Sequence, residues 1–123
     1  MSKEQIEIEA NVLVDLAIYA WRLDAWLSQQ NDMQSGTVPR YVVRGLNRLL
    51  EQCNVSTLDA TGNDFDAGLA FDVVDSIEMD NLPPGASIIG ETVSPIVTIN
   101  GNLARHGQIV LHVGEERGAA ENV

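Results

Sequence analysis

The chain has 123 residues and a formal charge of −11, from 18 Asp and Glu against 7 Lys and Arg, and 45% of its residues are hydrophobic. This length suits one compact domain or two very small ones, and the hydrophobic fraction argues against wholesale disorder. The acidic balance argues against nucleic acid as a partner, because phosphate binding needs a basic stripe.

Residues 3–30 predict a first helix, because they contain no Gly or Pro and are rich in Leu, Ala, Glu and Gln. Apolar residues cover more of this helix than the single face that a surface helix normally buries. We therefore expect it to pack against a second copy of itself in a homodimer. The residues predicted to form the dimer interface are Leu13, Leu16, Ala20, Leu23, Trp26 and Leu27.

Residues 37–52 predict a second helix, with Thr37 as its N-cap and Pro39 in its first turn. Arg40, Arg44 and Arg48 form a row at four-residue spacing. This row indicates either a docking stripe for an acidic surface or a solvated face that pairs with the acidic first helix. Cys53 continues the apolar stripe of the helix, which predicts a core position.

Beyond residue 60 the pattern changes to short strands and turns. Ser87–Val93, Pro95–Ile99 and Gln108–Val113 predict strands, and Asn100-Gly101 is the strongest short signal for a hairpin turn. The sequence thus predicts an α+β protein with an antiparallel β module. The expected domains are helical and dimerising over 1–58, β and partner-binding over 59–114, and a flexible tail over 115–123.

The sequence offers little catalytic chemistry. Lys3 is the only lysine, and no nucleotide-binding or nucleophile motif is present. Asp64, Asp66 and Gly68 superficially resemble a calcium loop, but the fifth and sixth positions of that loop do not fit. His106 and His112 lack a third ligand for a metal. We expect no metal, no cofactor and no enzymatic activity.

The single cysteine excludes a disulfide within the chain and fits a reducing compartment. Neither a secretory leader nor a membrane-spanning segment can be recognised in the sequence. We therefore expect a cytoplasmic protein that does not associate with membranes.

Residues 42–113 resemble the GrpE family, the nucleotide exchange factors of DnaK-type chaperones. The likeness begins in the segment LNRLLEQCNVSTLDATGNDFDAGLAFDVV, where leucines at helical spacing are followed by an extended stretch, a glycine and a Phe-Asp motif. It continues with Pro84-Gly85, Asn100-Gly101 and Arg105, and ends in the strand Gln108-Ile109-Val110-Leu111.

The resemblance implies a co-chaperone without chemistry of its own. The helices would form a homodimeric bundle, and the β module would dock on the ATPase domain of a DnaK-type chaperone and speed the release of ADP. Arg105 is the first candidate for a partner contact, and it is the only Lys or Arg between Arg48 and Arg117. Further candidates are Ile96, Val97 and Leu103.

Three alternatives are consistent with parts of the sequence. The segment VTINGNLARHGQIVLHVG is similar to the SpoA modules of flagellar switch and secretion-ring proteins. A family member that kept only the fold would act as a structural adaptor. A small enzyme or ligand-binding domain would use an acidic site between Asp59 and Asp80.

Overall fold

The computed structural model describes residues 4–30 and 37–115, which form two compact units. The helical unit comprises the described residues up to Thr57 together with Val97–Arg105. The β unit comprises Leu58–Ile96 and the described residues from His106 onward. The predicted α+β class is confirmed. The predicted tail lies outside the described residues, apart from Glu115.

The helical unit begins with two helices, α1 (Ala10–Ser28) and α2 (Thr37–Gln52). The bounds of α2 are those predicted, whereas α1 begins later than predicted. Glu9, its N-cap residue, is extended, with φ −60° and ψ 142°. Before it, Ile6 and Ile8 alternate with glutamates, a period of two that favours extended chain over helix. No helix in the described ranges combines the length and apolarity needed to cross a bilayer.

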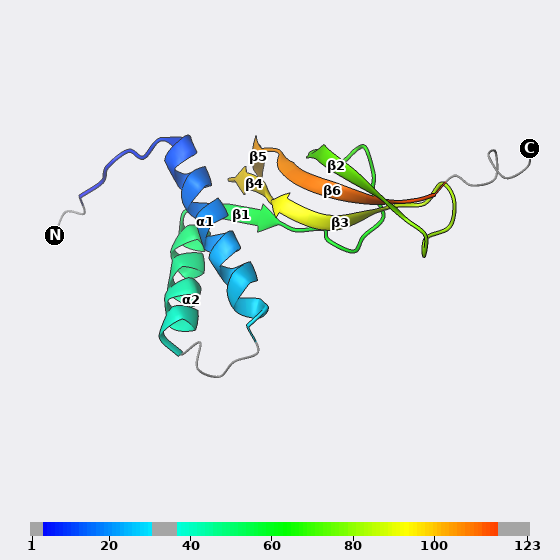
Figure 1. Cartoon of the computed structure of the whole chain (residues 1–123). Helices are drawn as coiled ribbons and strands as arrows, with labels where there is room; N and C mark the ends of the chain where they lie inside the picture. Colours follow the sequence, from blue (N-terminus) through cyan, green and yellow to red (C-terminus); the bar gives the residue numbers. More distant parts are fainter. Residues whose placement is uncertain (1–3, 31–36, 116–123) are drawn as a thin grey trace, which may run out of the picture. The chain divides into compact units, whose positions relative to one another are not determined.

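A small sheet completes the helical unit (Figure 1). Its strands are β1 (Val55–Leu58), β4 (Ile96–Ile99) and β5 (Asn102–Arg105), in the order β1-β4-β5. Asn100 and Gly101, with φ 54° and 80°, form the predicted hairpin turn between β4 and β5. The Asn100 N–H donates to the Asn54 carbonyl at 2.9 Å, which ties this turn to the start of β1.

The core of the helical unit joins residues that are far apart in the sequence. It contains Val14, Ala17, Ile18, Ala20, Leu50, Val55 and Val97, with Leu13, Leu46 and Ile99 packed against it. Val97 is fully buried in this core, although residues 58–96, which belong to the β unit, lie between it and Val55 in the sequence. The hairpin of β4 and β5 therefore supplies side chains that the two helices need to close their core.

The β unit is a second three-stranded sheet, formed by β2 (Phe71–Met79), β3 (Ser87–Ser94) and β6 (Gly107–Gly114). Its order is β2-β6-β3, with β6 antiparallel to β3 and parallel to β2. One face packs on a core of Ala60, Phe71, Ile89, Ile96, Ile109 and Leu111.

Three features of the β region differ from the sequence predictions. The parallel pairing of β2 with β6 was not expected, because local hairpin signals say nothing about strands joined by a long connection. Neither β1 nor β2 was recognised as a strand. The predicted continuous β domain over 59–114 is interrupted, since Val97–Arg105 belongs to the helical unit.

Candidate functional site

The exposed surface of β5 holds the first candidate for a partner contact. Arg105 Nη1 lies 2.9 Å from Asp15 Oδ1 on α1, and the side chains of this pair are 39% and 56% exposed. An ion pair this exposed contributes little to stability, at most about 1 kcal/mol. The guanidinium can therefore leave Asp15 for another carboxylate at small cost.

Arg105 and Leu103, the two predicted contact residues on β5, lie on opposite faces of the sheet because of a bulge. Arg105 pairs with Val97, whereas Leu103 pairs with Thr98, so two residues on β5 advance against one on β4. Opposed residues of a ladder share a face of the sheet. Arg105 therefore lies on the face of Val97, toward α1, and Leu103, 49% exposed, lies on the other face.

Ile96 and Val97 are not available to a partner. They are 5% and 0% exposed, and they belong to the cores of the β unit and of the helical unit, respectively. Adjacent residues of a strand point to opposite faces, and here both faces are covered. Their predicted role in partner binding is therefore withdrawn.

Helix α1 carries an apolar stripe that its own unit leaves uncovered. The exposed residues follow each other at spacings of four and three, which places them on one face of the helix. They are Val12, Leu16, Tyr19, Leu23 and Trp26, each between 38% and 66% exposed. Of the predicted interface, Leu16, Leu23 and Trp26 lie on this stripe.

The remaining predicted interface residues of α1 face inward. Ala20 and Leu27 are both 2% exposed, and Leu13 is partly buried against the core of the helical unit. Their burial within one chain removes them from the contact surface. The apolar residues around α1 thus form two faces. One packs in the core of the helical unit, and the other is exposed.

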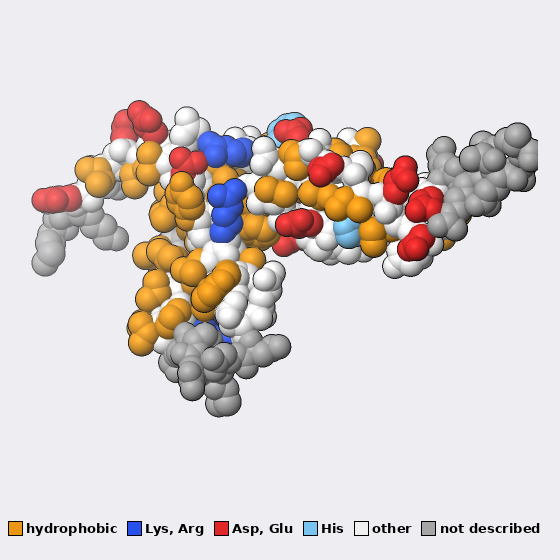
Figure 2. Space-filling view, in the orientation of Figure 1, with side chains coloured by type: hydrophobic (Ala, Val, Ile, Leu, Met, Phe, Trp, Pro, Cys, Tyr) orange, Lys and Arg blue, Asp and Glu red, His pale blue; other side chains and the backbone are white. Residues whose placement is uncertain are grey.

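Helix α2 has a matching stripe that the sequence analysis missed. It consists of Val38, Tyr41, Val42 and Leu49, each between 46% and 71% exposed. The spacing of three and four from Val38 onward was the available signal, but the arginine row was singled out instead. Hydrophobic side chains cover much of the helix pair on the face shown in Figure 2. We call the two stripes together the helical apolar surface.

The arginine row of α2 is mostly solvated. Arg40 Nη2 approaches the carbonyls of Leu27 and Gln30 at 3.4 and 3.5 Å, where the end of α1 leaves carbonyls without helical partners. Arg44 and Arg48 form no ion pair with another described residue. Cys53, predicted as core, is exposed, because α2 ends one residue before it.

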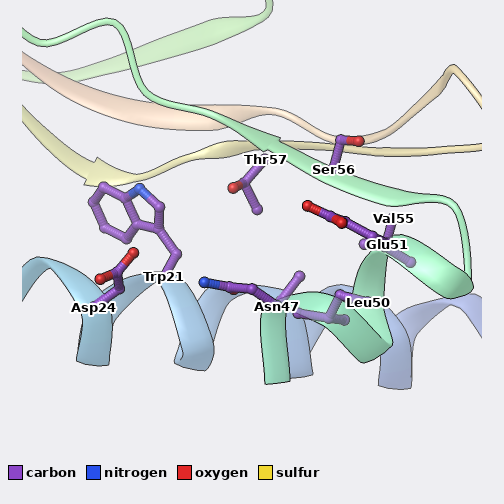
Figure 3. Close-up of a pocket in the computed structure, with 9 residues that line it drawn as sticks. Trp21, Asp24, Asn47, Leu50, Glu51, Val55, Ser56 and Thr57 are labelled. Carbon is purple, nitrogen blue, oxygen red and sulfur yellow. The ribbon is translucent and has the colours of Figure 1, made fainter. Parts of the chain in front are cut away.

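A half-open pocket of about 270 Å³ lies in the helical unit (Figure 3). Its lining includes the Trp21 indole and two carboxylates, Asp24 from α1 and Glu51 from α2. Asp24 lies beside Trp21 at one end, whereas Glu51 lies near Ser56 at the other, so the carboxylates do not converge on one point. This geometry does not provide the paired carboxylates that general acid–base catalysis uses.

The acidic residues of the β unit hold turns and loops. Asp66 Oδ1 accepts the Gly68 N–H at 2.8 Å, and Asp59 Oδ1 accepts the Thr61 N–H and the Thr92 hydroxyl, both at 2.9 Å. The bonds from the Gly68 and Thr61 amides, each two residues after its aspartate, are typical of Asx turns, whereas the Thr92 bond joins β3 to the loop after β1. Within the described ranges, no group of three or more His, Cys, Asp or Glu gathers in a way that could hold a metal ion.

No protein-family model and no curated protein matches this chain. The candidate functional surfaces are therefore identified by their chemistry alone. They are the helical apolar surface and the exposed part of β5 with Arg105.

Proposed function

We propose that this protein is a nucleotide exchange factor of the GrpE type, which binds the ATPase domain of a DnaK-type chaperone and accelerates the release of ADP. The resemblance over residues 42–113 supports this proposal, as does the order of two helices followed by β strands. The single observation that carries it furthest is the helical apolar surface. A second helical layer is what this surface lacks, and the homodimeric bundle implied by the resemblance would supply one.

The proposed mechanism is differential binding. A partner whose nucleotide cleft is open would fit this protein better than the same partner closed around ADP. Because binding linkage is reciprocal, bound ADP must weaken the complex by the factor by which the complex weakens ADP binding. No residue of this chain needs to carry out a chemical step.

Arg105 is the residue proposed to contact the chaperone. Its guanidinium is part of an exposed and weak ion pair, so a carboxylate of the partner can replace Asp15. An arginine is suited to this exchange, because its planar fork binds carboxylates in a bidentate manner. Leu103, on the opposite face of β5, would add an apolar contact only if the partner also reaches that face.

The test measures release of a fluorescent ADP analogue from a DnaK-type chaperone at increasing concentrations of this protein. We expect release to accelerate and to saturate. Arg105→Ala should raise the concentration needed for half-maximal acceleration by about 10- to 100-fold, the worth of a charged hydrogen bond. Asp15→Asn is the matched control, since it breaks the same internal ion pair and keeps the arginine.

The two variants separate binding from structure. If Arg105 contacts the chaperone, Asp15→Asn should retain the activity of the unchanged protein or exceed it. Equal losses in both variants would instead assign the internal ion pair a purely structural role. A folded protein that accelerates release from no DnaK-type chaperone would contradict the proposed function, and the adaptor and secretion-ring alternatives would then be tested.

A further inference from the structure

The outer edge of β2 is an unpaired strand edge in the β unit. The other edge strand, β3, is covered by the loop over 62–65: the Gly62 N–H donates to Ile89 at 2.7 Å, and the Ile89 N–H donates to Asn63 at 2.9 Å. In the sheet order β2-β6-β3, β2 forms the opposite edge (Figure 1). Apart from the Phe71 N–H, which donates to the Leu69 carbonyl at 2.9 Å, no backbone hydrogen bond between described residues reaches that side of β2.

This edge is long and its side chains are accessible. β2 has nine residues, of which only Phe71 is buried and Met79 partly buried. Val73, Val74 and Ile77 are between 43% and 51% exposed. One edge amide has a local acceptor, because the Ser76 N–H donates to Asp75 Oδ1 at 2.8 Å. The strand thus offers a row of backbone groups together with apolar contacts for a chain that lies beside it.

The charge on and around β2 has one sign. Asp72, Asp75, Glu78 and Asp80 lie on the strand or directly after it. A bulge at Val74 pairs Asp72 with Gln108 and Asp75 with Val110, which places both carboxylates on one face. The sequence of the whole described β unit holds nine Asp or Glu and no Lys or Arg. Two histidines lie beside β2: His106 Nδ1 is 3.3 Å from Asp72, and His112 pairs with Ile77 in the β2–β6 ladder.

The negative charge of β2 determines which kinds of chain could bind at its outer edge. A second copy of β2 would bring like charges together across the new ladder, which is destabilising. The extended segment before α1 alternates Ile6 and Ile8 with glutamates, so it would be repelled in the same way. Nucleic acid is excluded by the same sign of charge. The occupant that fits is an extended polypeptide with basic side chains.

We infer that the outer edge of β2 binds an extended, Lys- or Arg-bearing segment of a partner protein by strand addition. The bound segment pairs its backbone with β2, and its basic side chains face Asp72 and Asp75 on one face and Glu78 on the other. A carbonyl of the segment takes the Ser76 N–H, and the Asp75 carboxylate is released to a basic side chain. This inference does not depend on the proposed exchange activity.

The test uses the full chain and a short capped peptide of alternating Lys and Val. Binding is followed by backbone amide NMR and by amide hydrogen exchange. We expect shifts and slowed exchange concentrated in Phe71–Met79. Two peptide controls accompany it, one with Glu in place of Lys and one with alternate backbone nitrogens methylated. The methylated peptide keeps its charge but loses the donors along one edge, so it should bind at least about tenfold more weakly.

Paired variants of the protein test the role of charge. Asp72→Asn with Asp75→Asn should weaken binding by about tenfold, because both carboxylates lie on one face and the lysines of the peptide share one face, and an Asn side chain at position 75 still provides an acceptor for the Ser76 N–H. Glu7→Gln with Glu9→Gln makes the same change of net charge in the helical unit and should alter binding by less than about twofold. The NMR spectrum of each variant verifies its fold.

Three results would overturn the inference. The first is no binding of the Lys-Val peptide to the folded protein. The second is equal binding of the methylated peptide, because attraction without backbone pairing is not strand addition. The third is a set of shifts centred outside β2. The acceleration of ADP release is measured in a separate experiment, so a negative result for one proposal does not contradict the other.

Discussion

Gly107 on β6 pairs with Phe71 in the β2–β6 ladder and lies against the Phe71 ring. A Cβ at this position would lie 2.5 Å from Phe71 Cδ1 and 2.9 Å from the Ile96 nitrogen. Neither atom has room to move, since both residues belong to the core. We predict that Gly107→Ala lowers the free energy of unfolding by about 1–3 kcal/mol, as overpacked cores do. Urea unfolding followed by circular dichroism measures the loss.

Gly45→Ala is the matched control for that substitution. Gly45 lies inside α2, and a Cβ there meets no atom within 4 Å. Because alanine is the better helix former, this variant should gain up to about 1 kcal/mol. A Gly107→Ala protein as stable as the unchanged one would show that the Phe71 ring can shift after all.

Thr92 joins β3 to the loop after β1 through a buried hydroxyl. The side chain is 8% exposed, and its oxygen lies 2.9 Å from Asp59 Oδ1 and 2.7 Å from Thr61 Oγ1. Thr92→Val keeps the shape and removes both bonds, so we expect a loss of about 1–3 kcal/mol. Thr98→Val, at a partly buried position with no such bond, should change the thermal midpoint little. Equal midpoints for the two variants would contradict this role of Thr92.

Residue roles were predictable from the sequence only where local pattern decides them. The φ > 0 turn at Asn100-Gly101 is set by those two residues, and the structure has it as predicted. Burial is set by partners far along the chain. Ile96 and Val97 carried no local sign that one packs in the β unit and the next in the helical unit. Cys53 was predicted as core because its spacing continues the apolar stripe of α2, although the helix ends at Gln52 as predicted.

Helix α1 has two apolar faces, and only one of them is used within the chain. If the exposed stripe forms the dimer interface, Leu16→Glu with Leu23→Glu should weaken dimerisation by at least about 100-fold, since each leucine would bring a charge into an apolar contact. Sedimentation equilibrium measures the association. The helical unit itself should stay folded, because both side chains are already exposed in one chain.

Asn11→Glu with Gln29→Glu provides the control for this prediction. Both side chains are exposed and polar, Asn11 on α1 and Gln29 directly after its last residue, and the change of net charge is identical. This variant should dimerise like the unchanged protein. A chain that sediments as a monomer at micromolar concentration without any substitution would remove the dimer from the proposed function.

Elements with strong local signals were predictable, and those that depend on distant partners were not. Residues 37–52 combine a capping threonine, an early proline and helical spacing, and α2 has these bounds. β2 reads as an acidic loop because its strand character comes from pairing with β6, some 35 residues later. The exposed stripe of α2 was not predicted, because the apolar spacing that leads to Cys53 belongs to the other face of this helix.

At the scale of the molecule, adjacent residues of one strand stabilise different units. We predict that Val97→Ala destabilises the helical unit and Ile96→Ala the β unit, the latter by about 2–4 kcal/mol. Trp21 and Trp26, both on α1, report the helical unit by fluorescence. Amide signals of β6 report the β unit by NMR. If each substitution shifts both transitions equally, the two units unfold as one and the prediction is wrong.

The composition of the sequence changes near residue 60, and the first boundary between the two units lies between Thr57 and Leu58. The return of Val97–Arg105 to the helical unit was not predicted. Nothing in the letters VTINGNLAR distinguishes a hairpin that pairs with β1 from one that extends the second sheet. When two strands are far apart in the sequence, their pairing depends on which core can accommodate their side chains. That is a property of the whole fold.

The interrupted order of the two units also has a consequence for biosynthesis. When Thr57 has been made, the helices still lack Val97, and the forty residues from Leu58 to Val97 take on the order of seconds to synthesise. The β unit waits longer still, for β6. During that interval the nascent helices expose their inner apolar face as well as the outer one. A message cut short before codon 97 would therefore yield a polypeptide that chaperones and proteases recognise, rather than a smaller working domain.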